Sequence, residues 1–367
     1  MTEPMSLHGK SSRLLIRQES PFNGGPPPDD LRRTFVTPND LFFVRNHGEV
    51  PAVDAVEFRL EVQGAVRERL ELSLADLATF PRHEVTATIQ CAGNRRSELA
   101  AAKPIPHELP WASEAVSTAR WAGVRLADVL EAAGPTSGAR HAAFCGLDDT
   151  ERHGKRFHFG GSIPLDKAMQ PEVLLATEMN GETLPPVHGF PLRVVVPGWI
   201  GARSVKWLHK IRLQAAPSDN YFQAVAYRLF PASIGPENVV WEEGTMLGEQ
   251  AVNAIVTSPQ TGDAVRAGEV RFAGIALAGG GRRVERVELS ADGGRTWIRA
   301  ELGDEEETWS WRFWEARLAL APGEHEIAVR AWDSASQTQP PAVEQVWNFK
   351  GYMNNAWARV AVSVRAD

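Results

Sequence analysis

Cysteine is scarce in this chain, and its scarcity excludes several classes of protein. The 367 residues contain two cysteines, Cys91 and Cys145, so a disulfide framework does not organise the fold. No Cys-x-x-Cys-His sequence occurs, which argues against covalent attachment of a c-type haem. No hydrophobic run approaches the length of a membrane span, so we expect no membrane partner.

The first residues also lack the features of an export signal. The apolar stretch Leu14-Leu15-Ile16 is too short for the hydrophobic part of a secretory signal peptide. The pair Arg32-Arg33 is not followed by an export-type sequence either. We therefore predict a cytoplasmic protein, or a periplasmic one if a signal peptide has been removed.

Charge and composition narrow the class further. The net charge is −7, which argues against a general nucleic-acid-binding protein. Hydrophobic residues make up 43% of the chain and charged residues 23%, as is typical of a soluble globular protein. At 367 residues the chain is long enough for about two or three domains.

The chain divides into three stretches of different character. Residues 1–35 are polar and rich in Gly and Pro, which predicts an N-terminal arm or loop. Residues 36–240 mix short β-like runs with short helical patches and predict an α+β catalytic domain. We expect a linker within Pro236–Gln250, and residues 250–367 form the last stretch.

The last stretch has the pattern of an all-β domain. Strand-like runs follow one another, and turns containing Gly, Asp or Pro separate them. This spacing predicts a β-sandwich, for which we expect an immunoglobulin-like topology. The predicted strands are Val252–Thr257, Glu269–Ala276, Val284–Ser290, Trp297–Glu301, Trp309–Arg317 and Glu324–Trp332.

The segment around Cys91 carries the most informative chemistry. A β-like run ends at this cysteine, and Gly93-Asn94 and the pair Arg95-Arg96 follow. Neighbouring cations favour the thiolate form of a cysteine, and thiolates bind soft metals. The alternative is a buried, unreactive cysteine. The residues alone leave both interpretations open.

Two further stretches bring polar groups to the ends of apolar runs. Phe42–His47 delivers an arginine, an asparagine and a histidine together, as an anion clamp or as an ordinary surface turn. In His188–Trp207 an apolar strand is followed by a glycine-containing turn that bears Arg203 and Lys206. Such a turn can hold a phosphate, and the alternative is a buried strand with a charged rim.

Taken in order, these stretches resemble the molybdenum domain of the sulfite oxidase family. The similarity extends over roughly residues 35–365 and is far more specific than any single motif. The similar segments are Phe43–His47, Cys91–Arg96, Trp111, Ser117–Val124, Gly146–Asp148, Gly161–Pro164, Glu178–Gly181, His188–Trp207, Ala226–Arg228, Trp347–Gly351 and Asn355–Trp357.

The resemblance implies one molybdenum–molybdopterin cofactor per chain, with no haem and no flavin. It makes Cys91 the protein ligand to the molybdenum. The implied substrate-pocket residues are Arg45, Arg96, Trp111, Tyr227 and Lys350. The residues implied around the pterin and its phosphate are Phe43, Asn46, His47, Asp148, His188, Arg193, Arg203, Ser204 and Lys206.

The same resemblance implies a reaction and partners. Sulfite would be oxidised to sulfate by oxygen-atom transfer, and electrons would pass to a separate acceptor such as a cytochrome c. Arginines in the pocket suit a doubly charged oxyanion. The C-terminal stretch resembles the dimerisation domain of the family, so we expect a homodimer.

Three features depart from the family pattern. Lys350 stands where sulfite oxidases usually carry an arginine, and a lysine lacks the planar fork for bidentate contacts. No haem domain precedes residue 40, so the chain resembles the haem-free, bacterial-type members. The loop Asp149–Phe159 is rich in charge where the family usually has small residues.

Lys350 leaves alternatives to sulfite oxidation open. One is a different reaction on the same scaffold: a sulfane dehydrogenase, or a reductase of nitrate or of an S- or N-oxide. Another is a non-catalytic binding protein whose C-terminal stretch recruits a partner.

Overall fold

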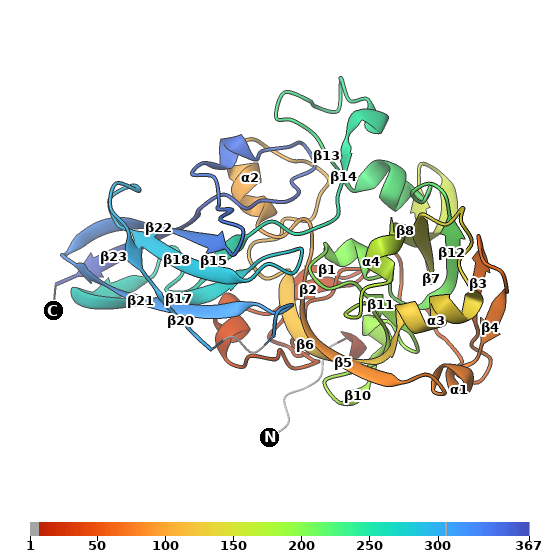
Figure 1. Ribbon diagram of the computed structural model, residues 1–367. Coiled ribbons are helices and arrows are strands. Elements are labelled where there is room, and N and C mark those ends of the chain that lie inside the picture. Colours follow the sequence, from red (N-terminus) through yellow and green to blue (C-terminus); the bar gives the residue numbers. More distant parts are fainter. Residues whose placement is uncertain (1–6, 305–306, 367) are drawn as a thin grey trace.

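Two parts of the chain lie side by side in the computed structural model, which describes residues 7–304 and 307–366 (Figure 1). The strands up to β12 (Leu208–Gln214) belong to one part, and the strands from β15 (Asn253–Ser258) onward form the other. Among the described residues, no helix is both long enough and apolar enough to cross a membrane.

One sheet of the first part carries the strand that leads to Cys91. Its strands are antiparallel in the order β10-β9-β6-β5, and β11 also pairs with β9. Because alternate residues of a strand share a face, Ala87, Ile89 and Cys91 lie in one buried cluster. The strands are β5 (Arg82–Gln90), β6 (Val116–Arg125), β9 (Leu174–Met179), β10 (Glu182–Thr183) and β11 (Arg193–Val195).

The second sheet of this part has the order β4-β3-β12-β7-β8. The pair β12–β3 is parallel, and the other pairs are antiparallel. The long hairpin β7–β8 includes most of the charged loop noted in the sequence. The strands are β3 (Leu60–Gly64), β4 (Leu70–Leu72), β7 (His141–Arg152), β8 (Lys155–Pro164) and β12 (Leu208–Gln214).

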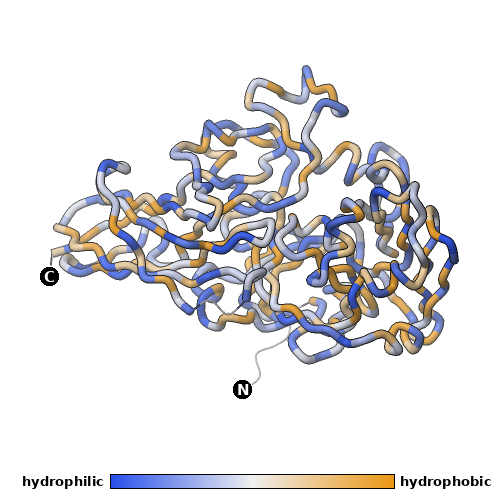
Figure 2. The backbone as a smooth tube through the Cα atoms, in the orientation of Figure 1, coloured by the Kyte–Doolittle hydropathy of each residue, from blue (hydrophilic) through white to orange (hydrophobic). Residues whose placement is uncertain are grey.

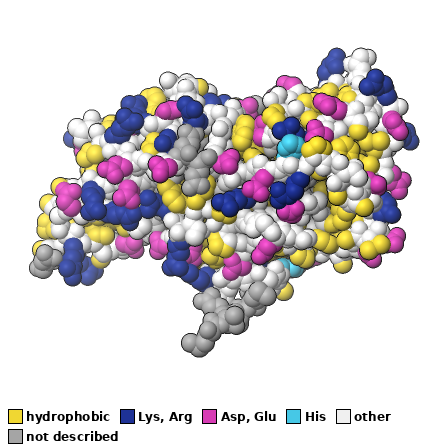
Figure 3. Space-filling view, turned by 60° about the horizontal axis from the view of Figure 1, so that its bottom comes forward, with side chains coloured by type: hydrophobic (Ala, Val, Ile, Leu, Met, Phe, Trp, Pro, Cys, Tyr) yellow, Lys and Arg dark blue, Asp and Glu magenta, His cyan; other side chains and the backbone are white. Residues whose placement is uncertain are grey.

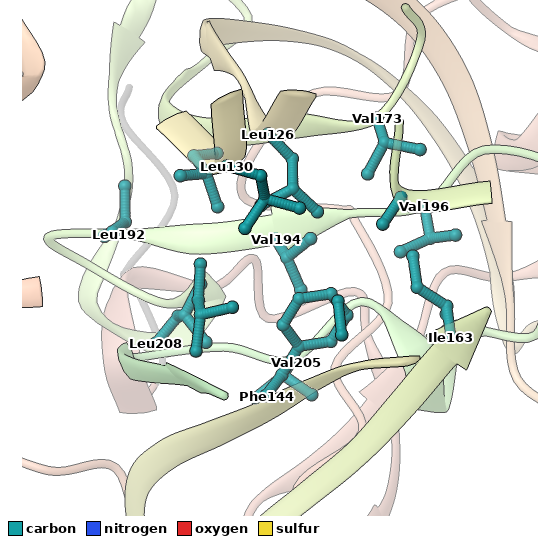
Figure 4. Packing of buried hydrophobic residues seen from close by; sticks show 14 of the residues in the cluster. Leu126, Leu130, Phe144, Ile163, Val173, Leu192, Val194, Val196, Val205 and Leu208 are labelled. Carbon is teal, nitrogen blue, oxygen red and sulfur yellow. The ribbon is translucent and has the colours of Figure 1, made fainter. Parts of the chain in front are cut away.

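The strand β11 separates the hydrophobic core from a pocket. Val194 packs in the main core, with Leu126 and Leu130 of the helix α3 above it and Phe144 of β7 below (Figure 4). The two-residue period of a strand turns Arg193 to the opposite face, where it lines the pocket. The apolar strand β11 therefore places one arginine, Arg193, in the lining of the pocket.

The helices of the described residues are short and connect the strands, and the last of them lies in the C-terminal part of the chain. The α-helices are α1 (Leu74–Leu77), α2 (Arg96–Ala102), α3 (Leu126–Ala133) and α4 (Leu165–Ala168). The 3₁₀ and π turns are η1 (Leu7–Gly9), η2 (Pro28–Arg32), η3 (Pro186–His188), η4 (Gly201–Arg203), η5 (Phe222–Ala226, a π-helix), η6 (Trp241–Glu243) and η7 (Val343–Gln345).

The described part of the predicted N-terminal arm is packed against the first part of the molecule. It contains a small hairpin of β1 (Leu15–Gln18) and β2 (Asn23–Gly25). Leu14 and Phe22 are buried in a cluster with Val44 and Val187. The arm is therefore mostly irregular, as expected, but hydrophobic contacts hold it in place.

The C-terminal part consists of two sheets that share one core. The sheet orders are β15-β17-β21-β20 and β16-β23-β22-β18-β19, and both contribute to the same buried cluster. The strands are β15 (Asn253–Ser258), β16 (Ala264–Arg266), β17 (Gly268–Leu277), β18 (Val284–Ser290), β19 (Ile298–Arg299), β20 (Glu301–Leu302), β21 (Arg312–Leu320), β22 (Gly323–Asp333) and β23 (Ala358–Arg365).

The predicted α+β part followed by an all-β part is confirmed, with differences in detail. The single strand expected at Trp297–Glu301 is split, because β19 and β20 belong to different sheets. The sequence-based strands omit β16 and β23, although the burial of β23 alternates residue by residue. An immunoglobulin-like topology stays a prediction.

The stretch expected to be a linker, Pro236–Gln250, is structured. It contains η6 and β14 (Thr245–Met246), which pairs with β13 (Arg228–Leu229). Leu247 and Gln250 are buried. The predicted linker is therefore packed against the first part through the pairing of β13 with β14.

Charged and hydrophobic residues are interspersed along the chain. Orange and blue segments alternate along the backbone in both parts of the molecule (Figure 2). On the face shown in Figure 3, basic and acidic side chains are intermixed rather than gathered into one stripe. Several basic side chains also line an interior pocket, as described next.

Candidate active site

One pocket collects most of the residues that the sequence singled out. The lining comes from the Phe42–His47 segment, from the end of β5, from β7 and β8, and from the stretch around β11 and η4. Its lining residues are Phe42, Phe43, Arg45, Asn46, His47, Ile89, Cys91, Asp148, Phe159, His188, Arg193, Gly201, Ala202, Ser204, Lys206, Trp207 and Tyr227.

Cys91 lies in the pocket wall directly after β5. The cysteine is unpaired and buried, and the backbone N–H of Gly93 donates a hydrogen bond of 3.4 Å to its Sγ. The other cysteine, Cys145, lies on β7 and does not line the pocket. Within the described residues, no group of three or more His, Cys, Asp or Glu side chains could hold a metal ion. A metal at Cys91 would therefore take its other ligands from a cofactor or solvent.

The side of the pocket formed by Asp148, His188, Arg193, Ser204 and Lys206 is called the cofactor wall here. Arg193 donates to the backbone oxygens of His188 (3.0 Å) and Ser204 (3.1 Å). Lys206 donates to Asn46 Oδ1 and to the oxygen of Val187. In the described part of the chain, the hydrogen-bond partners of Arg193 and Lys206 are backbone or amide oxygens and include no carboxylate.

Burial disfavours the charges on the cofactor wall. It lowers the pKa of Arg193 to about 9. Burial, together with the nearby charge of Arg193, lowers the pKa of Lys206 well below its ordinary value. Burial raises the pKa of Asp148 to about 6, although Lys206 opposes this effect. Such a wall gains stability when an anionic group binds to it.

Three buried polar atoms around the cofactor wall have no hydrogen-bond partner in the described structure. They are Asn46 Nδ2, Asp148 Oδ1 and Arg193 Nε. Buried polar groups are nearly always satisfied, so these atoms indicate a missing polar ligand. Two donors and one acceptor beside unpaired cations fit the polar edge and the phosphate of a pterin cofactor.

Lys10 reaches the cofactor wall from the N-terminal arm. Its Nζ lies 2.8 Å from His188 Nε2, and burial lowers its pKa to about 7. Burial, then the charge of Lys10, lowers the pKa of His188 well below its ordinary value. Sequence analysis missed Lys10, because an isolated lysine in a polar arm carries no local signal.

His47 and Tyr227 form a hydrogen-bonded pair in the pocket. His47 Nε2 lies 2.8 Å from Tyr227 Oη, and His47 Nδ1 lies 3.2 Å from both Arg45 Nη2 and Arg152 Nη2. Because arginines only donate, Nδ1 accepts and the proton is assigned to Nε2. Nε2–H then donates to Tyr227 Oη, which leaves the tyrosine proton available for a ligand.

Both members of this pair are neutral. Burial, followed by the charges of Arg45 and Arg152, lowers the pKa of His47 well below its ordinary value. Burial raises the pKa of Tyr227 to about 12, so the phenol stays protonated. Arg152, from the charged β7–β8 hairpin, was not among the predicted site residues, and its approach to His47 depends on how that hairpin folds back.

The residues Arg96, Glu108, Lys350 and Tyr352 form what we call the outer cluster. Arg96 lies over the Tyr352 ring at 5.2 Å and donates to the backbone oxygen of Leu109. Lys350 and Glu108 form an ion pair. Tyr352 stacks on Tyr227, with 5.2 Å between ring centroids, and so connects the cluster to the pocket. Glu108 and Tyr352 were not predicted from the sequence.

Four predicted residues do not line the pocket, and Arg96 of the outer cluster is one of them. Arg203 donates to the backbone oxygens of Leu247 and Phe222 beneath the pocket rather than lining it. Trp111 is fully buried in the cluster that contains Cys91, again behind the lining. Lys350 is turned toward Glu108.

Comparisons with known proteins agree with this architecture. Residues 47–222 match the family described as oxidoreductase molybdopterin binding domain, and residues 245–365 match the Mo-co oxidoreductase dimerisation domain. The structure is also similar to the crystal structure of the sulfane dehydrogenase SoxCD from Paracoccus pantotrophus. The TM-score is 0.79 and the identity 24%, over 96% of this chain and 88% of that one.

Sequence relatives specify the family. Mitochondrial sulfite oxidase of Homo sapiens is 45% identical over 96% of this chain, and this chain spans 66% of its length. Sulfite oxidase of Arabidopsis thaliana is 39% identical over 95% of this chain and 93% of that protein. The chain belongs to the sulfite oxidase family of molybdopterin-dependent oxidoreductases. The predictions of family and of a molybdopterin-binding domain are thereby confirmed.

Proposed function

We propose that this protein binds one molybdenum–molybdopterin cofactor and oxidises sulfite to sulfate, with electrons passing to a separate acceptor. The observation that carries the proposal is the position of Cys91. It is the cysteine in the wall of a buried pocket that is lined by cations and that contains polar atoms without partners. The relatives named sulfite oxidase support the choice of substrate.

The residues present fit the cofactor. Cys91 would bind the molybdenum through its thiolate. Arg193, Lys206, His188 and Ser204 would hold the pterin and its phosphate, because cations and backbone-fixed donors favour an anion there. When bound, the cofactor supplies the oxygen-atom transfer and stores the two electrons taken from the substrate.

The protein side chains orient and neutralise the substrate. Arg45 lines the pocket, and Arg96 is fixed beside it by its bonds to Leu109 and Lys350 oxygens. Their charges would attract an oxyanion and hold it near Cys91. Tyr227 would donate its proton in a hydrogen bond to a substrate oxygen, since His47 occupies the other side of its hydroxyl.

Partners and location belong to the same proposal. The match of residues 245–365 to a dimerisation domain supports a homodimer, which sedimentation would test. A cytochrome c is the proposed acceptor, and a cytoplasmic location stays a prediction. The absorption spectrum of the purified protein would test the expected lack of haem and flavin.

The decisive experiment is a substrate comparison on purified protein of known molybdenum content. Sulfite should reduce ferricyanide and change the molybdenum EPR signal, whereas reduced dye should not be oxidised by nitrate or sulfoxides. Turnover of a sulfane or of nitrate in preference to sulfite would favour a sulfane dehydrogenase or a nitrate reductase. These alternatives stay open because Lys350 is paired with Glu108. If the protein purified from a cofactor-competent host contained no molybdenum, the proposal that it is a molybdenum enzyme would be contradicted.

A further inference from the structure

A carboxylate lies beside two cations of the proposed oxyanion pocket. Glu108 pairs with Lys350, and its Oε2 lies 3.7 Å from Arg96 Nη2. Arg96 and Lys350 are two of the residues that the family resemblance implies for substrate binding. A negative charge at this position opposes the binding of an anion, so its presence needs an explanation.

The backbone positions both partners of this ion pair. The chain turns at His107, whose φ of 65° lies in the left-handed region, directly before Glu108. Lys350 precedes Gly351, where an added Cβ would lie 2.6 Å from Arg96 Cγ, so the loop backbone is pressed against Arg96. The side chains keep exposures of only 17% for Glu108 and 19% for Lys350.

The charge of Glu108 reaches the pocket through the tyrosines. Tyr352 is buried between Arg96 and Tyr227. Burial raises the pKa of Tyr352 well above its ordinary value, and Glu108 raises it further. Tyr227, which lines the pocket, experiences the same carboxylate. Glu108 is therefore close enough to affect an anion bound beside Tyr227.

We infer that Glu108 is a specificity-determining residue, which holds Lys350 away from the substrate and weakens the binding of doubly charged oxyanions more than that of singly charged ones, while Arg45 and Arg96 still attract sulfite. The inference rests on the proposed function, because it concerns the oxyanion of that site. A lysine permits this arrangement, because its ammonium group is carried on a flexible side chain. The ammonium of Lys350 can therefore contact either the Glu108 carboxylate or a bound anion. The doubly charged product sulfate would be released readily.

Coulomb energy is proportional to the charge of the bound anion, which gives the test its form. Glu108→Gln should tighten the binding of perchlorate, a tetrahedral monoanion, by about threefold. The same substitution should tighten the binding of sulfate, a tetrahedral dianion, by about tenfold. The change in binding free energy doubles when the charge of the anion doubles. Calorimetry on the oxidised, cofactor-loaded protein at constant ionic strength measures both dissociation constants.

Two control variants separate charge from general damage. Glu172→Gln removes the same charge from another lysine–glutamate pair of low exposure, with Lys167, away from the pocket lining. It should leave both constants unchanged. Glu108→Asp keeps the charge, so its dissociation constants for sulfate and perchlorate should stay close to those of the native protein. A loss of fold would weaken the binding of both anions.

A double-mutant cycle tests the pairing itself. Lys350→Gln should change sulfate binding by less than about twofold in the native background and by more than about fivefold beside Glu108→Gln. Additive effects would overturn the inference, as would equal tightening of sulfate and perchlorate or unchanged sulfate binding. Because binding is measured without turnover, a protein that showed this pattern but did not oxidise sulfite would contradict only the proposed function.

Discussion

The cofactor wall and the outer cluster treat positive charge in different ways. On the wall, Arg193 and Lys206 are buried, bonded to backbone or amide oxygens, and held without a carboxylate partner in the described structure. In the outer cluster, Lys350 is paired with Glu108 and remains partly exposed. The wall is therefore suited to a permanent anion, whereas the cluster suits a substrate that enters and leaves.

Loss of the Cys91 sulfur should have the largest effect. Cys91→Ser is expected to abolish sulfite turnover, because a hydroxyl is a poor ligand for a soft metal, while pterin content stays near normal. Parallel assays of turnover, pterin fluorescence and molybdenum would measure this. Cys145→Ser, at the half-buried cysteine outside the pocket, is the control and should keep its activity. Near-normal turnover by Cys91→Ser would refute the ligand assignment.

A change on the cofactor wall should empty the site. Lys206→Met is expected to reduce bound molybdenum and pterin by roughly 10–100-fold, because it removes a buried cation from the proposed phosphate contact. Metal analysis per chain measures the effect. Lys210→Met, at a lysine paired with Glu61 on β12, is the matched control. Full cofactor occupancy in Lys206→Met would contradict the proposed role of the wall.

A change between the two regions should slow the reaction without loss of cofactor. Tyr227→Phe removes the hydroxyl that we propose as a hydrogen-bond donor to the substrate, so kcat should fall by about 10–100-fold. Steady-state kinetics with cofactor quantification test this, and Tyr221→Phe is the control because Tyr221 packs on Phe222 outside the pocket lining. Equal kcat for Tyr227→Phe and the native protein would show that the hydroxyl is not used.

The smallest expected effect is on the pH dependence of stability. In the folded protein burial lowers the pKa of Lys10 from 10.5 to about 7, so between these values the unfolded chain binds the extra proton. Raising the pH should therefore stabilise cofactor-free protein.

Cofactor-free protein should gain roughly 2–5 °C in Tm between about pH 7 and pH 9. Cofactor-loaded protein should gain less, because the phosphate would compensate the buried cations. Differential scanning calorimetry of both forms measures the two increases in Tm. Equal increases would contradict the proposal that the cofactor wall binds an anion that compensates its buried cations.

Much of the wall was predictable because its residues lie on or next to strands. The alternation along β5 and β11 places Cys91 and Arg193 on the pocket side. The order of motifs in His188–Trp207 then brought Lys206 to the same surface. Arg203 was predicted as a cofactor contact from the same segment, but the η4 turn directs it to the carbonyls of Leu247 and Phe222.

The outer cluster was only partly predictable. Its residues come from positions 96, 108, 350 and 352, so contacts across more than 240 residues of sequence create it. Glu108 and Tyr352 have no local pattern that distinguishes them from other polar or aromatic residues. The same is true of Lys10, which meets His188 at a separation of 178 residues.

The sequence by itself determined most of the C-terminal strands, the cysteine at the end of β5 and the family to which the chain belongs. These features depend on short-range periodicity and on ordered motifs, which are visible without coordinates. The tertiary structure decided which charges meet. Among the described residues it gave Arg193 and Lys206 no carboxylate as a hydrogen-bond partner and gave one to Lys350, because electrostatic partners are set by distance in the folded molecule rather than by position along the chain.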